Sequence, residues 1–344
     1  MKKYLIILLC LITFSKTHTM DRRASIHDKA LAIYGDFFLD LCNGIEEEDT
    51  SIIKRSLSKV NPNELIKCKF SPTVKMEASK KYIVLGHPDM ITIPNGVKVY
   101  IRPIHLCIKD KKLRSLECLL ESGARLEVDQ ELGSSLSLNK ESLDYYNRLL
   151  AIFTKHKFKI NSRDKDGKSL LHFATASANN NLIIALLNYK NIDVNAYDTV
   201  GRTPLHYLIL GKGQDVQARI SCLKTLMASR EIDPNKVDIA HRMSPLTMGI
   251  ISDPDLAKIL ITYDRVDPNA TVMNSYTPLM QAIKSDEAEI VSLILKRDIN
   301  VLKEDSKGHT AFDYAKDKPE LLALLNQHIS NTNTGKASFS NSQK

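Results

Sequence analysis

The chain has 344 residues, of which 43% are hydrophobic and 26% are charged, a composition typical of one large or two modest globular domains. It contains no tryptophan and only 6% aromatic residues, which disfavours single-stranded nucleic-acid binding by base stacking. The formal net charge of +8 comes from lysines and arginines spread along the chain, so a dedicated nucleic-acid surface is also disfavoured.

The first nineteen residues have the layout of a secretory signal peptide. Lys2 and Lys3 precede an apolar stretch from Tyr4 to Phe14, and the chain turns polar at Ser15. This stretch is too short to cross a bilayer, which needs about 20 apolar residues. We expect a signal peptide at 1–19, with cleavage after Ser15, cleavage after Thr19 or retention left open, and no stable membrane anchor after cleavage.

The cysteines do not predict a disulfide framework. Five remain after residue 19, an odd number without regular spacing, at Cys42, Cys68, Cys107, Cys118 and Cys222. Cys107 and Cys118 fall in apolar helical stretches, where a thiol acts as a small buried hydrophobe. Because no Cys and His pair has the spacing of metal ligands, we predict no metal site.

Residues 21–69 are charged and helical in character. Apolar residues recur at helical spacing from Leu31 to Leu41, and Ser51 to Leu57 predicts a second helix after the acidic run Glu46 to Asp49. The turn Asn61-Pro62-Asn63 follows and is similar to Asp267-Pro268-Asn269 later in the chain. We interpret this region as a degenerate repeat or an N-terminal cap.

Residues 80–101 predict an enlarged β-hairpin. Three β-like runs, 82–85, 91–93 and 97–101, are separated by two turn sequences, of which Pro94-Asn95-Gly96 is the stronger signal. Such a hairpin is either a contact surface or a lid packed on the end of the following domain.

A short pattern then appears twice. Asp166 to Ala174 and Val200 to Tyr207 align so that Leu171 and Leu205 lie 34 residues apart. Taking Pro204 as the reference, seven units can be phased, at Pro103, Ser135, Leu170, Pro204, Pro245, Pro278 and Ala311. The pattern is weakest in the unit phased on Ser135, at 130–161, where only Gly133 before the helix, Leu136, Leu138 and the later Leu149-Leu150 keep it.

The pattern has a physical reason. A glycine before the helix lets the backbone adopt positive φ in the turn. Thr203 supplies a hydroxyl N-cap, Pro204 occupies the first helical turn, and Leu205 faces the core. One unit cannot bury its apolar face alone, so neighbouring units must stack.

The motif Thr-Pro-Leu-His at 203–206, with this period, resembles the ankyrin repeat. The resemblance implies an all-α repeat solenoid of helix-turn-helix units with short β-turn fingers, in which His172 and His206 hydrogen-bond locally and to the next unit. The structural repeat positions are Gly167, His172, Gly201, Thr203, Pro204, Leu205, His206, Thr277, Pro278 and Gly308.

Several units depart from this pattern. Arg102 replaces the threonine, Thr247 and Met280 replace the histidine, and Leu170 and Ala311 replace the proline. We expect these units to be less stable locally. The interval from Pro204 to Pro245 is about eight residues longer than its neighbours, which predicts an extended connection at 211–215.

These observations divide the chain into four parts. A signal peptide (1–19) is followed by a degenerate repeat or cap with the hairpin insertion (21–101). The ankyrin-repeat domain (102–328) has about seven units and ends in a polar C-terminal cap. A tail rich in Ser, Asn and Thr (329–344) is predicted to be disordered.

No catalytic or cofactor-binding motif is present. The sequence lacks a Gly-x-Ser-x-Gly elbow, a His-Glu-x-x-His helix, a phosphate-binding loop and a paired Cys-x-x-Cys. His172 and His206 have structural roles, and Ser169 takes the N-cap position. We therefore predict neither an enzyme nor a cofactor nor a small-molecule substrate.

The resemblance implies a monomeric protein-binding module that contacts its partner through the concave face and the turn tips. The tip positions are Lys165, Asp166 and Lys168; Thr199, Val200 and Arg202; Ala240, His241 and Arg242; Asn274, Ser275 and Tyr276; Ser306, Lys307 and His309. Arg202, His241, Arg242 and Tyr276 are favoured, because arginine and tyrosine more often anchor interfaces.

The signal peptide and the repeats together resemble ankyrin proteins exported by bacteria that live inside eukaryotic cells. This resemblance implies a secreted or periplasmic protein, and within that class a host-directed effector that engages a host protein. Two alternatives stay open at this point. One is a periplasmic structural or protective ankyrin protein, and the other is a weak binder of nucleic acid or acidic lipid.

Overall fold

The computed structural model describes residues 41, 44–45, 47–58, 91–92, 98–99, 103–138, 140–211 and 214–340. The chain divides into two compact units, Met1–Leu126 and Glu127–Lys344. The predicted signal peptide at 1–19, the helix expected around Leu31, and Cys42 and Cys68 lie outside the described residues.

The first unit contains three described α-helices, α3 (Thr50–Leu57), α4 (Pro103–Lys109) and α5 (Leu113–Glu121). Asp49 caps α3, because its carboxylate accepts the backbone N–H groups of Ser51 at 2.9 Å and Ile52 at 3.2 Å. The helix predicted at 51–57 is therefore confirmed. Helix α5 packs against both α3 and α4, so α4 and α5 form the helix pair expected from Pro103.

Two short strands of the first unit, β1 (Ile91–Thr92) and β2 (Lys98–Val99), pair antiparallel. Ile91 lies opposite Val99, and Thr92 lies opposite Lys98. This pairing falls inside the hairpin predicted at 80–101. The other residues of that hairpin lie outside the described part of the chain, so its enlarged form stays a prediction.

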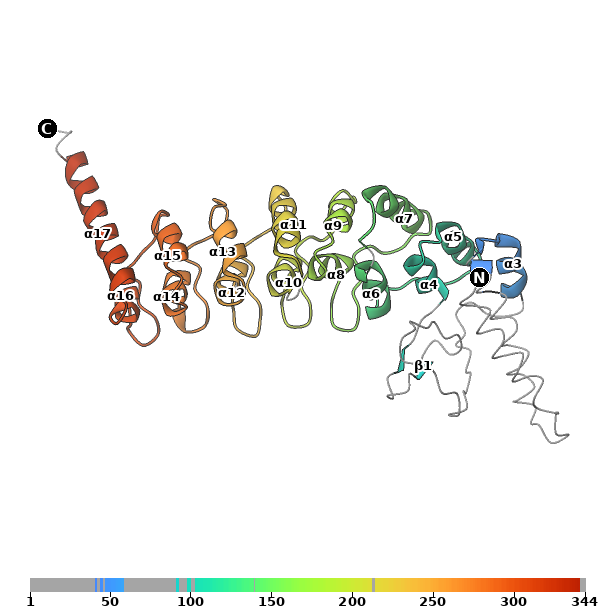
Figure 1. The fold of residues 1–344 in the computed structure, drawn as a ribbon, viewed down its shortest axis with the longest axis horizontal. Helices are drawn as coiled ribbons and strands as arrows, with labels where there is room; N and C mark the ends of the chain where they lie inside the picture. The colour runs from blue at the N-terminus through green and yellow to red at the C-terminus, as the bar shows by residue number, and fades with distance from the viewer. Residues whose placement is uncertain are drawn as a thin grey trace. The chain divides into compact units, whose positions relative to one another are not determined.

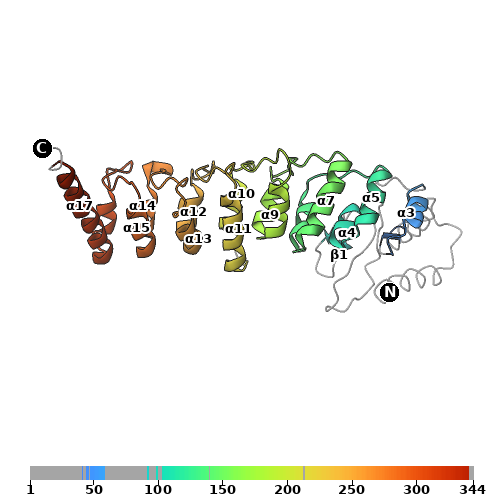
Figure 2. The same ribbon diagram turned by 90° about the horizontal axis from the view of Figure 1, so that it is seen from above.

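The second unit is built from successive helix pairs, shown in Figures 1 and 2. Helices α6, α8, α10, α12, α14 and α16 pack on one another in chain order as a first row, and α7, α9, α11, α13, α15 and α17 form a second row. Their bounds are α6 (Gln130–Leu138), α7 (Leu143–Lys155), α8 (Leu170–Ala176), α9 (Asn180–Leu187), α10 (Pro204–Leu210), α11 (Val216–Ala228), α12 (Pro245–Ser252), α13 (Pro254–Leu260), α14 (Pro278–Lys284), α15 (Ala288–Leu295), α16 (Ala311–Ala315) and α17 (Pro319–Ser340). The predicted all-α repeat solenoid is confirmed.

The core of the second unit runs between the two rows. The leucine after the helix start is buried in four first-row helices, with Leu171, Leu205, Leu246 and Leu279 no more than 3% exposed. Facing residues of the second row, including Ile183, Leu223, Leu256 and Ile290, are fully buried. Each pair therefore depends on its neighbours for a closed apolar interior, as the repeat pattern predicts.

The weak unit is phased differently from the prediction. Helix α6 begins at Gln130 and not at Ser135, because the Asp129 carboxylate accepts the backbone N–H of Leu132 at 2.7 Å and caps the helix there. Gly133 lies inside this helix and not in a turn. A Cβ at Gly133 would lie 2.3 Å from Cδ1 of Phe173, so glycine is required by the close approach of this ring.

Two further segments differ from expectation. Much of the extra length after Pro204 lies in α11, which has 13 residues where α9 has 8, while the connection 211–215 leads to its cap Asp215. Helix α17 continues to Ser340, although residues from 329 were expected to be disordered. Adding residues to an existing helix costs little compared with starting one, so a polar sequence can extend it.

Candidate protein-interaction surface

Five loops, here called fingers, project from the starts of the first-row helices, at the bottom of Figure 1. Each is closed by one backbone hydrogen bond, as from the Asp198 N–H to the Arg202 carbonyl at 3.0 Å. The residues that open and close the fingers are 164 and 168, 198 and 202, 238 and 243, 272 and 276, and 305 and 309. Finger 4 (272–276) contains the 3-10 turn Met273–Ser275.

An aspartate organises four of the fingers from within. The Asp198 carboxylate accepts the backbone N–H groups of Val200 at 2.9 Å and Arg202 at 2.8 Å. Asp164, Asp238 and Asp305 make equivalent pairs of bonds. These aspartates were not among the predicted residues, although their fixed place before each turn and the Asx-turn preference could have identified them.

The fingers require positive φ at one position. Gly167, Gly201 and Gly308 have φ of 79°, 77° and 78°, which confirms the predicted role of the turn glycines. At the equivalent positions of fingers 3 and 4, Arg242 and Ser275 adopt φ of 53° and 59°. These two side-chain-bearing residues are therefore held in a conformation that L-amino acids disfavour.

Histidine joins two fingers to the preceding first-row helices. The Ser169 N–H donates to His172 Nδ1 at 3.0 Å, while His172 Nε2 lies 3.0 Å from the Arg202 carbonyl, which closes the next finger. His206 repeats this arrangement, with the Thr203 N–H donating at 3.1 Å and Nε2 lying 3.1 Å from the Met243 carbonyl. The predicted local and inter-unit bonds are confirmed at both histidines.

This arrangement requires neutral imidazole. Because a carbonyl can only accept, Nε2 carries the proton and Nδ1 is the acceptor. Burial lowers the pKa of both His172 and His206 below the usual 6.5, against the opposing effect of the carbonyl bonds. The braces are therefore fully formed at neutral pH.

Two later units lack the brace, as their sequences indicate. Thr247 bonds only within its own cap, with its hydroxyl 3.2 Å from that of Ser244. The Met280 sulfur lies 3.5 Å from the Thr277 nitrogen and so occupies the place of an imidazole nitrogen. Neither side chain reaches the following finger through a bond of the imidazole type.

A second set of contacts joins neighbouring units in the turns that follow the second-row helices. Asn195 donates to the Glu231 carbonyl at 2.7 Å and accepts the Asp233 N–H at 2.9 Å. Asn161, Asn235 and Asn269 make the same pair of bonds to their following units. In the sequence, the units phased on Leu170 and Pro204 each end in a turn that carries Asn, at Asn195 and Asn235, but this recurrence did not reveal the ladder.

The predicted contact residues are not equally available to a partner. The side chains of His241 and His309 are 60% and 49% exposed, and Arg242 and Lys307 are exposed. Arg202 and Tyr276 are half-buried, and Lys168 is engaged with Asp166 at 3.4 Å and lies over the Tyr207 ring. Fingers 3 and 5 therefore present the most accessible of the predicted side chains.

The favoured residues did not include the exposed aliphatic side chains at three tips. Val200 is 39% exposed, Ile239 is 73% exposed and Met273 is 52% exposed. Val200 was among the predicted tip positions, while Ile239 and Met273 were not. An apolar residue within a turn was the available signal, because a turn has no core side.

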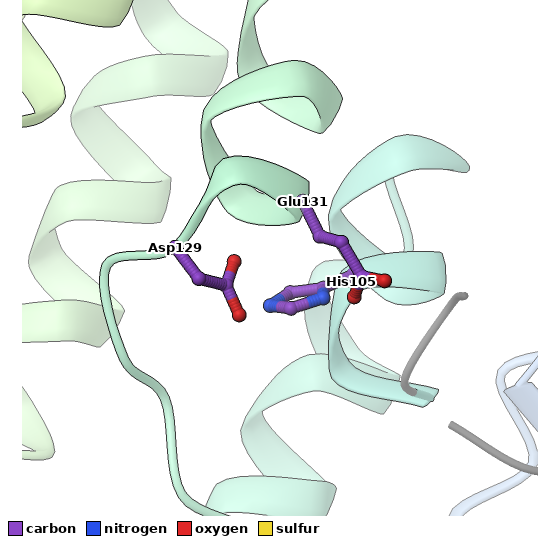
Figure 3. A group of neighbouring side chains, drawn as sticks. All are labelled: His105, Asp129 and Glu131. Atoms are coloured by element: carbon purple, nitrogen blue, oxygen red, sulfur yellow. The ribbon is translucent and has the colours of Figure 1, made fainter. Parts of the chain in front are cut away.

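Figure 3 draws three side chains of ligand type, His105, Asp129 and Glu131. His105 belongs to the first unit, where it is buried on α4. Asp129 and Glu131 belong to the second, where Asp129 caps α6 and Glu131 lies in its first turn, a favourable place for negative charge. Each residue has a place in its own unit, and no metal site is assigned to them.

The three cysteines within the described residues, Cys107, Cys118 and Cys222, are buried. Burial raises the pKa of Cys118 and raises that of Cys222 to about 11. Buried thiols at Cys107 and Cys118 are thus confirmed. No described helix has both the length and the apolar character needed to cross a membrane.

Stacked helix pairs with projecting fingers define a repeat solenoid of the interaction-scaffold class. A family model described as ankyrin repeats in three copies matches residues 104–238 and 246–334. This chain belongs to the ankyrin-repeat family. Ankyrin repeats form protein–protein interaction modules, and their fold is typically a non-catalytic scaffold.

Several known proteins are similar to this chain. It is 28% identical over 180 residues to tyrosine-protein kinase Shark of Drosophila melanogaster, covering 51% of this chain and 18% of the kinase. It is 24% identical over 200 residues to the human transient receptor potential cation channel subfamily A member 1, covering 54% and 17%. It is 25% identical over 201 residues to a putative ankyrin repeat protein of fowlpox virus, covering 58% and 26%. The matched region therefore spans about a quarter or less of these relatives.

A solved structure supports the fold. The ankyrin repeat domain of Bcl-3, described as a unique member of the IkappaB protein family, superposes with a TM-score of 0.54 at 17% identity. The match covers 65% of this chain and 97% of that chain. At this identity the likeness concerns the fold alone.

Proposed function

We propose that the protein binds a protein partner through its fingertips and the exposed face of its first-row helices. The observation that supports this is the combination of fixed backbones and exposed, varied side chains in the fingers. Aspartate carboxylates, glycines at positive φ and imidazole braces hold the loops in place, while their tips expose aliphatic and cationic groups. Loops held this way lose little conformational entropy on binding.

The first-row helices add a second part to this surface. Ile251, near the end of α12, is 49% exposed although it is a large aliphatic residue. Phe173 and Tyr207 lie half-buried on α8 and α10. Apolar side chains left partly in water on the same helix row are suited to the centre of an interface.

We further propose that the protein is exported and acts on a host protein. The support is the sequence at 1–19, where two lysines precede an apolar stretch and a polar turn. A bacterial source and a host partner are part of this proposal. The relatives described above come from animals and a poxvirus, so the proposal rests on this leading segment.

Two experiments test these proposals. The location and N-terminus of the mature chain, determined by fractionation and sequencing, test export. An intact Met1 inside the producing cell would rule export out.

Affinity capture from host extract with the full chain tests partner binding. Ile251→Arg should abolish capture of a specific partner. Leu302→Arg, which changes a 61% exposed leucine in the turn after α15, should still capture it. Equal capture by both variants would contradict the proposed surface.

A further inference from the structure

Val200, Ile239 and Met273 lie on three successive fingers, and we call them the aliphatic ridge. Together they account for three of the seven large hydrophobic side chains that are exposed within the described residues. A single exposed aliphatic residue is ordinary, but a set gathered on adjacent loops marks an interaction surface. Ile239, at 73%, is the most exposed of the seven.

Two of the three ridge residues are joined by the backbone. The Ile239 N–H donates to the Val200 carbonyl at 2.9 Å, so fingers 2 and 3 are bonded directly at the ridge residues. A Cβ at Gly201 would lie 2.4 Å from Cγ1 of Ile239, which shows how closely this side chain covers finger 2. The backbones of Val200 and Ile239 are therefore held side by side.

The charges that a partner can reach on fingers 2 and 3 are cationic. Arg242 is exposed on the same finger as Ile239, and Arg202 is half-buried beside Val200. The acidic residues of these fingers, Asp198 and Asp238, are 7% and 1% exposed and accept backbone N–H groups from within. The ridge is therefore apolar in its middle and positive on fingers 2 and 3, whereas the Asp166 carboxylate on neighbouring finger 1, 47% exposed, is paired with Lys168.

We propose that the aliphatic ridge binds an acidic polypeptide segment that carries aliphatic side chains. This proposal rests on the proposed function and names the chemical class of its partner. Aliphatic groups of the segment cover Val200, Ile239 and Met273, and its carboxylates pair with Arg242 and Arg202. Arginine is suited to such pairing because its planar guanidinium can bind a carboxylate with two parallel hydrogen bonds.

Polyanionic partners fit the same surface less well. Single-stranded nucleic acid is usually held by aromatic stacking, and the ridge offers three aliphatic side chains instead. The buried aspartates also offset the arginine charges at distances beyond direct contact, which weakens attraction toward a phosphate backbone or an anionic membrane. A carboxylate in direct contact with the exposed guanidinium is affected less.

The test uses fluorescent twelve-residue peptides and fluorescence anisotropy with the full chain. One peptide combines Leu and Val with Glu and Asp, a second replaces the acids by Lys, and a third replaces the aliphatic residues by Ser. Vesicles with an anionic lipid and a single-stranded oligonucleotide complete the set of probes. Binding of the first peptide alone supports the proposal. Preference for the vesicle, the oligonucleotide or the lysine peptide overturns it.

Matched variants assign the binding to the ridge. Val200→Ser and Val216→Ser change the same residue type at the same 39% exposure, but Val216 begins α11, away from the fingers. We expect Ile239→Ser to weaken binding of the acidic peptide about tenfold and Val200→Ser to weaken it by a smaller factor, since each variant loses apolar area buried in the complex. Val216→Ser should have no effect. Equal losses in Val200→Ser and Val216→Ser overturn the proposal.

Arg242→Gly separates binding from folding. Glycine relieves the positive φ at this position, so the variant should be at least as stable as the parent, yet it should bind the acidic peptide several-fold more weakly. Unchanged peptide binding by this variant overturns the assigned charge contact. If host-protein capture depends on Ile251 while no acidic peptide binds, the proposed function stands and this inference fails.

Discussion

The units around α8 to α11 and those around α12 to α15 share one fold but are joined to their neighbours by different chemistry. In the first region, His172 and His206 reach the carbonyls that close the next fingers, at 3.0 and 3.1 Å. In the second region, Thr247 and Met280 stand at the histidine positions and make only local contacts. The imidazole braces of the first region are absent from these two positions.

In the second region, arginine side chains in the turns after α13 and α15 join each unit to the preceding one. The Arg265 guanidinium donates to the carbonyls of Met227 at 2.6 Å and Ile232 at 2.9 Å in the preceding unit. Arg297 donates to Ile261 at 2.6 Å and Val266 at 3.1 Å. The comparison shows that equivalent repeats can be coupled through a neutral ring at the fingers or through a permanently charged group in the turns.

The largest loss of stability is expected from a substitution where the two regions meet. Arg219 on α11 forms a buried ion pair with Asp253, which also caps α13, and donates to the carbonyls of Leu208 and Ile209. Arg219→Met would leave a carboxylate without its partner in the interior. We expect a loss of about 3–5 kcal/mol in the free energy of unfolding, measured by urea denaturation.

A double variant checks this cause. Arg219→Met combined with Asp253→Ser removes both charges and keeps a capping hydroxyl for α13. It should recover most of the stability lost in the single variant. A double variant as unstable as Arg219→Met would show that the loss comes from packing and from the lost bonds to the Leu208 and Ile209 carbonyls, and not from the unpaired charge.

The next largest loss of stability is expected at His206, and it can be compared directly with the loss at the equivalent position, Thr247. His206→Ala removes a fully buried brace and leaves the Thr203 N–H and the Met243 carbonyl without this partner, so a loss of about 3 kcal/mol is expected. Thr247→Ala removes a contact within one cap and should cost about 1 kcal/mol. Denaturation of the two variants in parallel measures the difference, and similar losses would show that the inter-unit bond contributes little.

Acid should affect the two regions differently. Burial lowers the pKa of His172 and His206, so the unfolded chain binds more protons, and stability present above pH 6.5 is lost as the pH falls toward their folded-state values. Each pKa unit of lowering corresponds to about 1.4 kcal/mol per histidine. Denaturation against pH should show this slope in the parent and a shallower one in His172→Gln/His206→Gln, in which titration is absent. Equal slopes in the parent and the double variant would show that His172 and His206 do not cause the acid sensitivity.

The C-terminal finger should respond only at lower pH. The Tyr314 hydroxyl, 2.6 Å from Asp305, lowers the pKa of this carboxyl from 3.8 to about 2. Its contribution is therefore complete above pH 3.8 and is lost as the pH falls toward 2. This separates the acid effect at His172 and His206 from the protonation of Asp305.

The smallest effect is expected at the positive-φ positions of fingers 3 and 4. Arg242→Gly and Ser275→Gly relieve a disfavoured backbone and should stabilise the chain by about 0.5–1 kcal/mol each. Gly201→Ala should do the opposite, because its Cβ would also lie 2.7 Å from the Ile239 nitrogen. Thermal denaturation of the three variants checks both signs.

The sequence predicted the fold because the apolar period, the caps and the turn glycines are local signals. Pro204, Thr203 and Gly201 each specify a backbone conformation that their own chemistry favours. The unit at 130–161 was phased incorrectly because Gly133 looked like a turn glycine, whereas its role is to admit the Phe173 ring from another helix. A contact between distant residues of this kind leaves no local pattern.

The candidate surface was less predictable for the same reason. The tips could be located from the repeat period, but exposure depends on what lies beside each side chain in the folded unit. Lys168 is held by Asp166 and Tyr207, while Ile239 extends into solvent over Gly201. The arginine contacts of Arg265 and Arg297 join carbonyls 31 to 38 residues earlier in the chain and have no sequence motif.

Hydrogen exchange of the full chain, followed by mass spectrometry at about pH 7.5 and about pH 5.5, tests the central comparison most directly. After correction for the intrinsic effect of pH on exchange, peptides from 164–211 should lose protection in acid, because protonated His172 and His206 cannot accept at Nδ1. Peptides from 254–300 should keep their protection, since Arg265 and Arg297 stay charged. Equal loss in both regions, or a larger loss in 254–300, would contradict the account.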